Sequence, residues 1–252
     1  MSTQNPNEFS RERLSIIINF LNTGKVNKAL DAVNALINEF PNHAILFNLQ
    51  GACFEANNQL NYSIKSFKQA ISIFPNYTQA FYNLGVVQNK SGKKIDSIKS
   101  YQKAISIKPD HFDAHNNLGI VFFELERFDD SINSYNNAIK INPKMADAYN
   151  NLGHVLSGIN QYNEAINAYE KGFNINPNLD FILGNILSSK INSCNWNNLS
   201  SLQSNIIESL GADNKKIIDP FSLMGLIDNP ELQRKATEIR VLSDHPKSNV
   251  LP

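Results

Sequence analysis

Four kinds of residue return along this sequence at a fixed spacing of 34 positions. The two clearest series are glycines and prolines, namely Gly51, Gly85, Gly119 and Gly153, and Pro41, Pro75, Pro109, Pro143 and Pro177. In the same register stand an alanine series and an aromatic series, namely Ala70, Ala104 and Ala138, and Phe67, Tyr101, Tyr135 and Tyr169. Chance does not place four series in one register, so the chain is predicted to consist of repeated structural units.

Each unit is predicted to be a pair of helices. The glycine falls inside a first helix, where it costs about 1 kcal/mol relative to alanine, so its position needs a packing reason. A missing side chain lets the second helix approach closely. A small residue early in the second helix is expected to be its counterpart, at Ala29, Ser63, Ser97, Ser131 and Ala165. The aromatic residue and the later alanine share one face of that helix, and the proline ends it.

This pattern resembles the tetratricopeptide repeat, a 34-residue helix–turn–helix unit. The resemblance implies an all-α fold, a right-handed α-solenoid (superhelix) of such units. A flexible tail over 1–9 is expected to precede five repeats, at 10–43, 44–77, 78–111, 112–145 and 146–179. The first repeat is atypical, with Ile17 at the glycine position. The register continues past residue 179, with Leu187 at the glycine position and Leu199 at the small-residue position, so residues 180–211 are interpreted as a sixth, divergent repeat that caps the array.

Composition excludes several classes of function. The 23 basic and 23 acidic residues cancel, and no lysine- or arginine-rich block is present, so nucleic acid is not an expected partner. No apolar run approaches about 18 residues, so no membrane span is expected. The start of the sequence lacks the pattern of a secretory signal, and Cys53 and Cys194 are expected to be reduced thiols of a cytoplasmic protein. No catalytic constellation, cofactor site or metal site is predicted.

A fifth series of the same period consists of asparagines. Its members precede the glycine position by two residues, at Asn83, Asn117, Asn151 and Asn185. Asn116 and Asn150 lie beside two of them, and His154 is expected to face the same groove. An asparagine amide can donate to one peptide carbonyl and accept from one peptide N–H. The series therefore predicts a concave surface of first helices that holds extended polypeptide by its main chain. The alternative is that an asparagine-rich chain collects such a series without function.

Binding by this surface alone is expected to be weak. One neutral hydrogen bond contributes about 0.5–1.5 kcal/mol net, so four contribute roughly 4 kcal/mol, which corresponds to millimolar affinity. Such a surface becomes useful when tethering raises the effective concentration of the partner.

The last 60 or so residues carry a second resemblance. Cys194-Asn195-Trp196, the stretch from Asp219 to Asp228, and Leu232-Gln233 resemble the segment that joins repeats to catalytic domain in bacterial O-GlcNAc-transferase-like proteins, of glycosyltransferase family 41 and related to plant SPINDLY. Residues 212–252 are thus expected to be a helical linker toward a catalytic domain absent from this sequence. The linker is predicted to hold helices over 221–227 and from Pro230 to about Ser243, and Trp196 is expected in the core.

The resemblance implies a fragment of an enzyme that transfers a sugar from a nucleotide donor to serine or threonine of a protein. The fragment itself is not expected to be an enzyme. Its expected partner is a protein or peptide, with a homodimer through the repeat surface as a further arrangement.

The alternative function is a general assembly scaffold or chaperone-type adaptor. Chaperone-binding tetratricopeptide domains clamp a terminal carboxylate with lysine and arginine. The equivalent positions here are uncharged, at Asn48, Tyr82, Asn116 and Asn150, which disfavours such a clamp.

Overall fold

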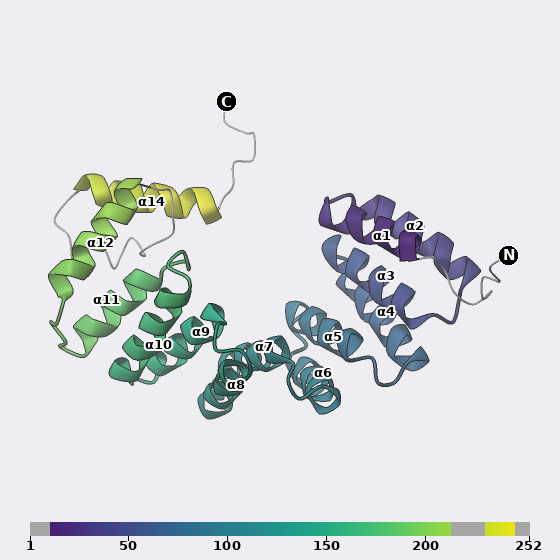
Figure 1. The fold of residues 1–252 in the computed structure, drawn as a ribbon, viewed down its shortest axis with the longest axis horizontal. Helices are drawn as coiled ribbons and strands as arrows, with labels where there is room; N and C mark the ends of the chain where they lie inside the picture. Colours follow the sequence, from purple (N-terminus) through teal and green to yellow (C-terminus); the bar gives the residue numbers. More distant parts are fainter. Residues whose placement is uncertain (1–10, 213–229, 245–252) are drawn as a thin grey trace. The chain divides into compact units, whose positions relative to one another are not determined.

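The fold is entirely helical in the part of the chain that the structure, a computed structural model, describes, which is residues 11–212 and 230–244. Those residues form thirteen α-helices and no strand (Figure 1). The predicted all-α fold of paired helices is therefore confirmed. The helices are α1 (Arg11–Asn22), α2 (Val26–Glu39), α3 (Ala44–Ala56), α4 (Leu60–Ile73), α5 (Thr78–Lys90), α6 (Lys94–Ile107), α7 (Phe112–Glu124), α8 (Phe128–Ile141), α9 (Ala146–Gly158), α10 (Tyr162–Ile175), α11 (Ile182–Asn192), α12 (Leu199–Ala212) and α14 (Pro230–Asp244).

The chain divides into two compact units, Met1–Val121 and Phe122–Pro252. In the first unit, α1 packs on α2, α3 on α4 and α5 on α6, and each pair contacts the next through α2–α3 and α4–α5. In the second unit, α9 packs on α10 and α11 on α12, with α8–α9 and α10–α11 joining successive pairs. Consecutive packing of this kind is typical of a tetratricopeptide solenoid.

The glycine of the first helix faces the aromatic ring of the second. A Cβ added at Gly51 would stand 2.6 Å from the ring of Phe67, and one at Gly85 would stand 2.7 Å from the ring of Tyr101. In the second unit the same pairing joins Gly153 to Tyr169, at 2.6 Å. All three rings are almost wholly buried. Two of the sequence series are thus the two sides of one contact, and its close approach explains why glycine occupies a helix interior.

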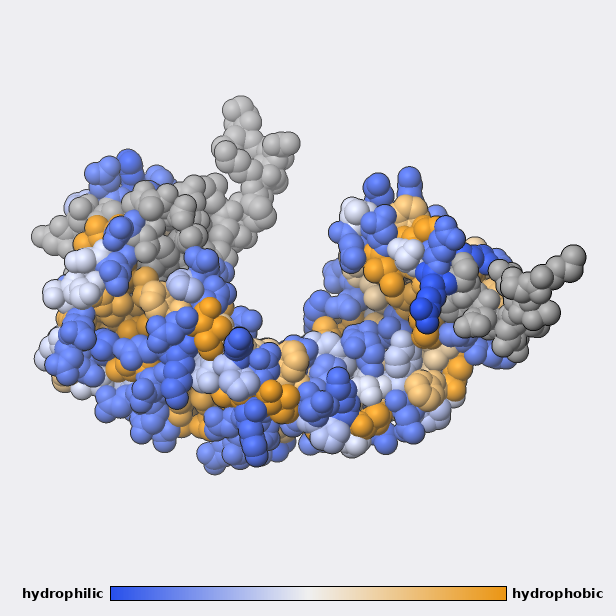
Figure 2. Space-filling model, in the orientation of Figure 1, coloured by the Kyte–Doolittle hydropathy of each residue, from blue (hydrophilic) through white to orange (hydrophobic). Residues whose placement is uncertain are grey.

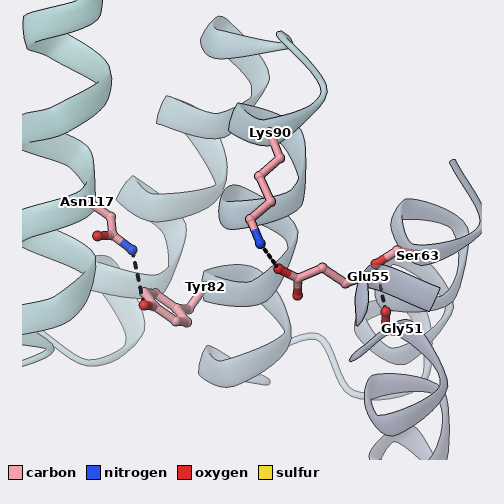
Figure 3. A network of polar contacts seen from close by, with 6 residues as sticks. All are labelled: Gly51, Glu55, Ser63, Tyr82, Lys90 and Asn117. Carbon is pink, nitrogen blue, oxygen red and sulfur yellow. Dashed lines mark hydrogen bonds and ion pairs between the residues drawn. The ribbon is translucent and has the colours of Figure 1, made fainter. Parts of the chain in front are cut away.

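The small residue of the second helix has a polar role as well as a steric one. The Ser63 hydroxyl donates to the carbonyl oxygen of Gly51 at 2.7 Å, and Ser97 donates to the carbonyl of Gly85 at the same distance (Figure 3 shows the first pair). Both serines are fully buried. A buried hydroxyl without a partner costs free energy, and this hydrogen bond removes that cost. It explains why serine is tolerated at a position for which the sequence analysis required only a small side chain.

The turn inside each helix pair repeats at the same period. A residue with positive φ stands at each of six positions 34 apart, namely Gly24 (70°), Asn58 (57°), Gly92 (76°), Glu126 (58°), Asn160 (62°) and Cys194 (53°). One residue further on, a backbone N–H reaches back across the end of the first helix, as from Gln59 to the Phe54 carbonyl at 2.8 Å. This is a helix ending of the Schellman type, which favours glycine and tolerates asparagine. Cys194 keeps the geometry in the last pair.

The last pair and the tail differ in part from expectation. Residues 182–212 form two helices, and Ala236 of α14 is buried in the core of the second unit together with residues of α9 to α12. The prediction that Trp196 lies in the core is wrong, because its side chain is 61% exposed in the turn before α12. Among the described residues, no helix pair follows α11 and α12 to cover the ring. The tail over 1–9 and the predicted helix over 221–227 lie outside the described residues.

The surface drawn in Figure 2 mixes hydrophilic residues with isolated hydrophobic ones in both units. Large hydrophobic side chains that remain exposed include Ile16, Tyr62, Phe74 and Ile95. No helix within 11–212 or 230–244 has the length and apolar character needed to cross a bilayer.

The two cysteines have opposite environments, which leads to a testable difference in reactivity. Cys53 is fully buried in the first unit, and this burial raises the pKa of its thiol to about 11, whereas Cys194 is exposed. At pH 8 only about 0.1% of a thiol with that pKa is thiolate, the reactive form. A thiol reagent is therefore expected to modify Cys194 first, and Cys53 at least about 100-fold more slowly. Peptide mapping by mass spectrometry over a time course measures both rates. Equal rates without denaturant would contradict this account of the core.

Candidate peptide-binding surface

In the first unit, Asn83 joins two neighbouring first helices. Its Nδ2 donates to Oδ1 of Asn48 at 3.0 Å, which links α5 to α3. Its own Oδ1 accepts from Nε2 of Gln79, one helical turn earlier, at 2.9 Å. Asn48 is buried, while Asn83 is only half-buried. Since an asparagine amide has two donors and two acceptor positions, Asn83 retains one of each after these contacts.

Asn117 repeats this arrangement one unit later. Its Nδ2 donates to the hydroxyl of Tyr82 at 3.0 Å, which links α7 to α5 (Figure 3). Its Oδ1 accepts from Nδ2 of the adjacent Asn116 at 3.3 Å. Asn116 is buried and Asn117 half-buried. The Asn117 amide also interacts with the hydroxyl of Tyr101, so both of its donors have partners and one acceptor position remains for a further partner.

The surroundings of Tyr82 are aromatic, with the carboxylate of Asp113 nearby. The ring of His111 stacks on that of Tyr82, with centroids 4.9 Å apart. Burial lowers the pKa of His111, which keeps the imidazole neutral at physiological pH. Burial, assisted by the charge of Asp113, raises the pKa of Tyr82, so its hydroxyl remains a hydrogen-bond donor. Nearby, Lys90 on α5 pairs with Glu55 on α3 at 2.6 Å, so that these two charges neutralise each other (Figure 3).

In the second unit, the predicted residues lie on α9 and α11. Asn185 and His154 form a hydrogen bond of 3.3 Å between Nδ2 and Nε2, and the His154 ring meets the edge of Tyr169 at a centroid distance of 5.5 Å. Asn151 is half-buried on α9. The Oδ1 atom of Asn150, on the same helix, is buried and has no hydrogen-bond partner within the described residues. A buried acceptor left this way costs about 1–3 kcal/mol, which a bound donor would relieve.

The asparagine series thus has a structural use that sequence reasoning missed. Three of its four members, Asn83, Asn117 and Asn185, bond to the preceding first helix. Their partners are Asn48, Tyr82 and His154, which stand 35, 35 and 31 positions earlier. Asn48 and Tyr82 each stand 35 positions before the asparagine that they contact. A polar residue at that spacing is the sequence signal that could have revealed these two contacts. The amides are not wholly available to a ligand, and each keeps only part of its hydrogen-bonding capacity.

Comparison with known protein families matches part of the chain. Profiles described as TPR repeat match residues 90–125 and 121–158, and one described as Tetratricopeptide repeat matches residues 146–179. Residues 90–179 are tetratricopeptide repeats. The helix pairs α3–α4 and α5–α6 carry the same glycine–aromatic contact as α9–α10, so the repeat architecture extends beyond the matched residues. No curated protein matches the chain in sequence.

Solved tetratricopeptide structures share the fold. The crystal structure of MamA is 23% identical and has a TM-score of 0.60, over 64% of this chain and 95% of that one. YrrB, described as a TPR protein with an unusual peptide-binding site, is 16% identical with a TM-score of 0.60, over 83% and 99%. PilF of Pseudomonas aeruginosa is 11% identical with a TM-score of 0.70, over 81% and 93%. At these identities the similarity establishes the fold alone.

Proposed function

We propose that the chain is a protein-interaction module that binds extended polypeptide along its first helices. One observation carries this proposal. After bonding to its neighbours, the half-buried amide of Asn83 retains one donor and one acceptor position, and that of Asn117 retains one acceptor position. One donor beside one acceptor is the complement of a peptide group. The peptide-binding site described for YrrB, which shares the fold, supports the same use.

The chemistry of this surface favours main-chain recognition over recognition of charge. Asn48, Tyr82 and Asn116 occupy the positions at which a carboxylate clamp would need cations, and the Lys90 ammonium is paired with Glu55. Because peptide groups are the same in every sequence, amide recognition selects for an extended conformation rather than for particular side chains. The expected ligand is an unfolded or disordered segment of a protein.

Replacing Asn83, Asn117, Asn151 and Asn185 by alanine is expected to weaken capture of 15-residue peptides of mixed sequence on an array. Each lost contact should lower affinity by about 2- to 10-fold, since a neutral hydrogen bond contributes about 0.5–1.5 kcal/mol. The matched control replaces four exposed asparagines of the second helices, namely Asn136, Asn137, Asn167 and Asn174. Equal capture by the two variants would refute the proposal.

Loss of the contacts between first helices could lower stability as well, so a second variant separates the two effects. Tyr82→Phe keeps the ring stacked on His111 and removes the hydroxyl alone. Urea unfolding then reports the structural cost, and peptide capture at a concentration where both proteins are folded reports the function.

A finer assignment is the substrate-recruiting region of a protein O-glycosyltransferase. It rests on the resemblance of the tail, of which residues 213–229 lie outside the described residues, and no comparison supports it. The general scaffold or adaptor is the alternative that needs no such parent. Reading the gene beyond codon 252 distinguishes them, because a nucleotide-sugar domain supports the first and a stop codon excludes it.

A further inference from the structure

A small cavity in the second unit lies between α10, α11 and α12. None of these helices carries Asn83 or Asn117, the two residues on which the proposed function rests. Its volume is about 180 Å³. That is more than the ~10–15 Å³ that one water needs, and less than the ~300–1,000 Å³ of pockets for drug-sized ligands. The cavity therefore suits a group about the size of one amino-acid residue.

Apolar, neutral polar and charged side chains line this cavity, and the charged ones are Lys190 and Glu170. One part of the wall is apolar, with Phe173, Leu183 and Leu202. The other part is polar, with Asn198 just before α12, Ser201 in its first turn and Asn205 in its middle. A ligand that fills the cavity well must then combine a short apolar chain with a polar head.

The Lys190 side chain supplies a positive charge in the wall. Lys190 is only 8% exposed, although it carries an ammonium group. Its Nζ donates to the Asn197 carbonyl at 3.4 Å and lies 3.7 Å from Oε1 of Glu170. Both distances exceed the ~2.7–2.9 Å of a strong charge-assisted hydrogen bond. An ammonium has three donors, so a buried one with two long contacts is poorly compensated.

The first turn of α12 contributes backbone donors, one of them at a residue of the cavity wall. The backbone N–H groups of Ser200 and Ser201 have no acceptor within the described residues. Unbonded N–H groups at the first turn of a helix, together with the helix dipole, favour an anion. Ser201 itself lines the cavity, so one of these groups belongs to a residue of the wall.

We propose that this cavity binds a carboxylate that carries a short apolar chain. The carboxylate lies between the Lys190 ammonium and the first turn of α12, and the chain packs on Phe173, Leu183 and Leu202. Glu170 is the internal competitor. Its side chain is 49% exposed, so it can turn toward solvent when another carboxylate approaches Lys190. A free branched acid and the C-terminal residue of a polypeptide are two sources of this same chemistry.

The test titrates the full chain and follows the backbone amide shifts of Ser200 and Ser201 by NMR. The probes are 4-methylpentanoate, a short peptide ending in a leucine carboxylate, and the same peptide with a C-terminal amide. Shifts with the acids and none with the amide are expected. If 4-methylpentanoate binds as tightly as the peptide acid, the source is a free acid; tighter binding of the peptide acid identifies a polypeptide end. The proposal would be overturned by equal, non-zero shifts with the acid and amide peptides, by the absence of shifts with both 4-methylpentanoate and the peptide acid, or by equal shifts with inorganic phosphate and 4-methylpentanoate.

Variants with opposite expected effects keep the proposal open to refutation even where one folds poorly. Lys190→Met should weaken binding of 4-methylpentanoate by about 10-fold or more, because it removes a charged donor. Glu170→Gln should strengthen it by about 3-fold or more, because a like charge is removed from the site. Lys171→Met changes an exposed lysine of α10, the helix that carries Glu170, and should leave binding unchanged. Unchanged affinity in both Lys190→Met and Glu170→Gln would eliminate the site. Peptide capture by Asn83, Asn117, Asn151 and Asn185 is a separate measurement, so this proposal and the proposed function can fail independently.

Discussion

Replacing Phe67 with alanine is expected to lower the free energy of unfolding of the first unit by about 3–5 kcal/mol. The ring is 0% exposed and lies against the first-helix backbone at Gly51. Because no side chain of α3 stands between that backbone and the ring, its removal leaves a cavity that the helices cannot easily close. Phe74→Ala is the matched control, since that ring is 51% exposed and should cost less than about 1 kcal/mol. Urea unfolding followed by circular dichroism measures both.

The same contact predicts an effect that depends on context. In the natural chain, Gly51→Ala places a Cβ 2.6 Å from the ring, and such overpacking costs about 1–3 kcal/mol against a gain of about 1 kcal/mol in helix propensity. In the Phe67→Ala background the clash is gone, so the substitution should stabilise by up to about 1 kcal/mol. A double-mutant cycle measures this coupling. If Gly51→Ala had the same effect in both backgrounds, close contact with the Phe67 ring would not be the reason for glycine at position 51.

The sequence predicted the helix pairs well because their contacts repeat. A glycine facing an aromatic ring 16 residues later leaves a trace at every period, as Gly51–Phe67 and Gly153–Tyr169 do. The sequence indicates the backbone geometry of the turns less clearly. Gly24 and Gly92 suggest positive φ, but Glu126 and Cys194 adopt the same conformation without a residue type that signals it. There, packing of the two helices decides the backbone, and local preference does not.

The sequence predicted equivalent positions for the candidate residues, and it did not predict their hydrogen bonds. A period of 34 places Asn83, Asn117 and Asn185 at equivalent points of three helices, but it does not say what each amide contacts. That depends on the partner helix, which offers an amide, a phenol and an imidazole in turn. Lys190 gave no signal at all, because nothing in the sequence distinguishes a buried lysine from an exposed one.

Stability of the helix pairs is expected to fall steeply above pH 10, because three tyrosines occupy the aromatic position. Burial raises the pKa of Tyr101, Tyr135 and Tyr169 well above the usual value, and each ring is 2% exposed. The folded chain therefore keeps these phenols protonated while the unfolded chain loses its protons near pH 10. Unfolding then releases protons, so the free energy of unfolding decreases as pH rises from about 10, and the loss continues up to the folded pKa values. Each tyrosine contributes about 1.4 kcal/mol per pH unit in that window.

The chain contains its own control for this effect. Phe67 fills the same position of an equivalent helix pair without an ionisable group, so phenylalanine fits this contact. The triple variant Tyr101→Phe, Tyr135→Phe, Tyr169→Phe should keep the helical content at pH 8 and lose most of the decline in urea midpoint between pH 10 and pH 11. Cys53, Tyr77 and Tyr82, whose pKa values are also raised by burial, act in the same direction and remain in both proteins. If the urea midpoint of the triple variant fell with pH as steeply as that of the natural chain, the buried phenols would not control alkaline unfolding. Charge elsewhere in the chain would then control it.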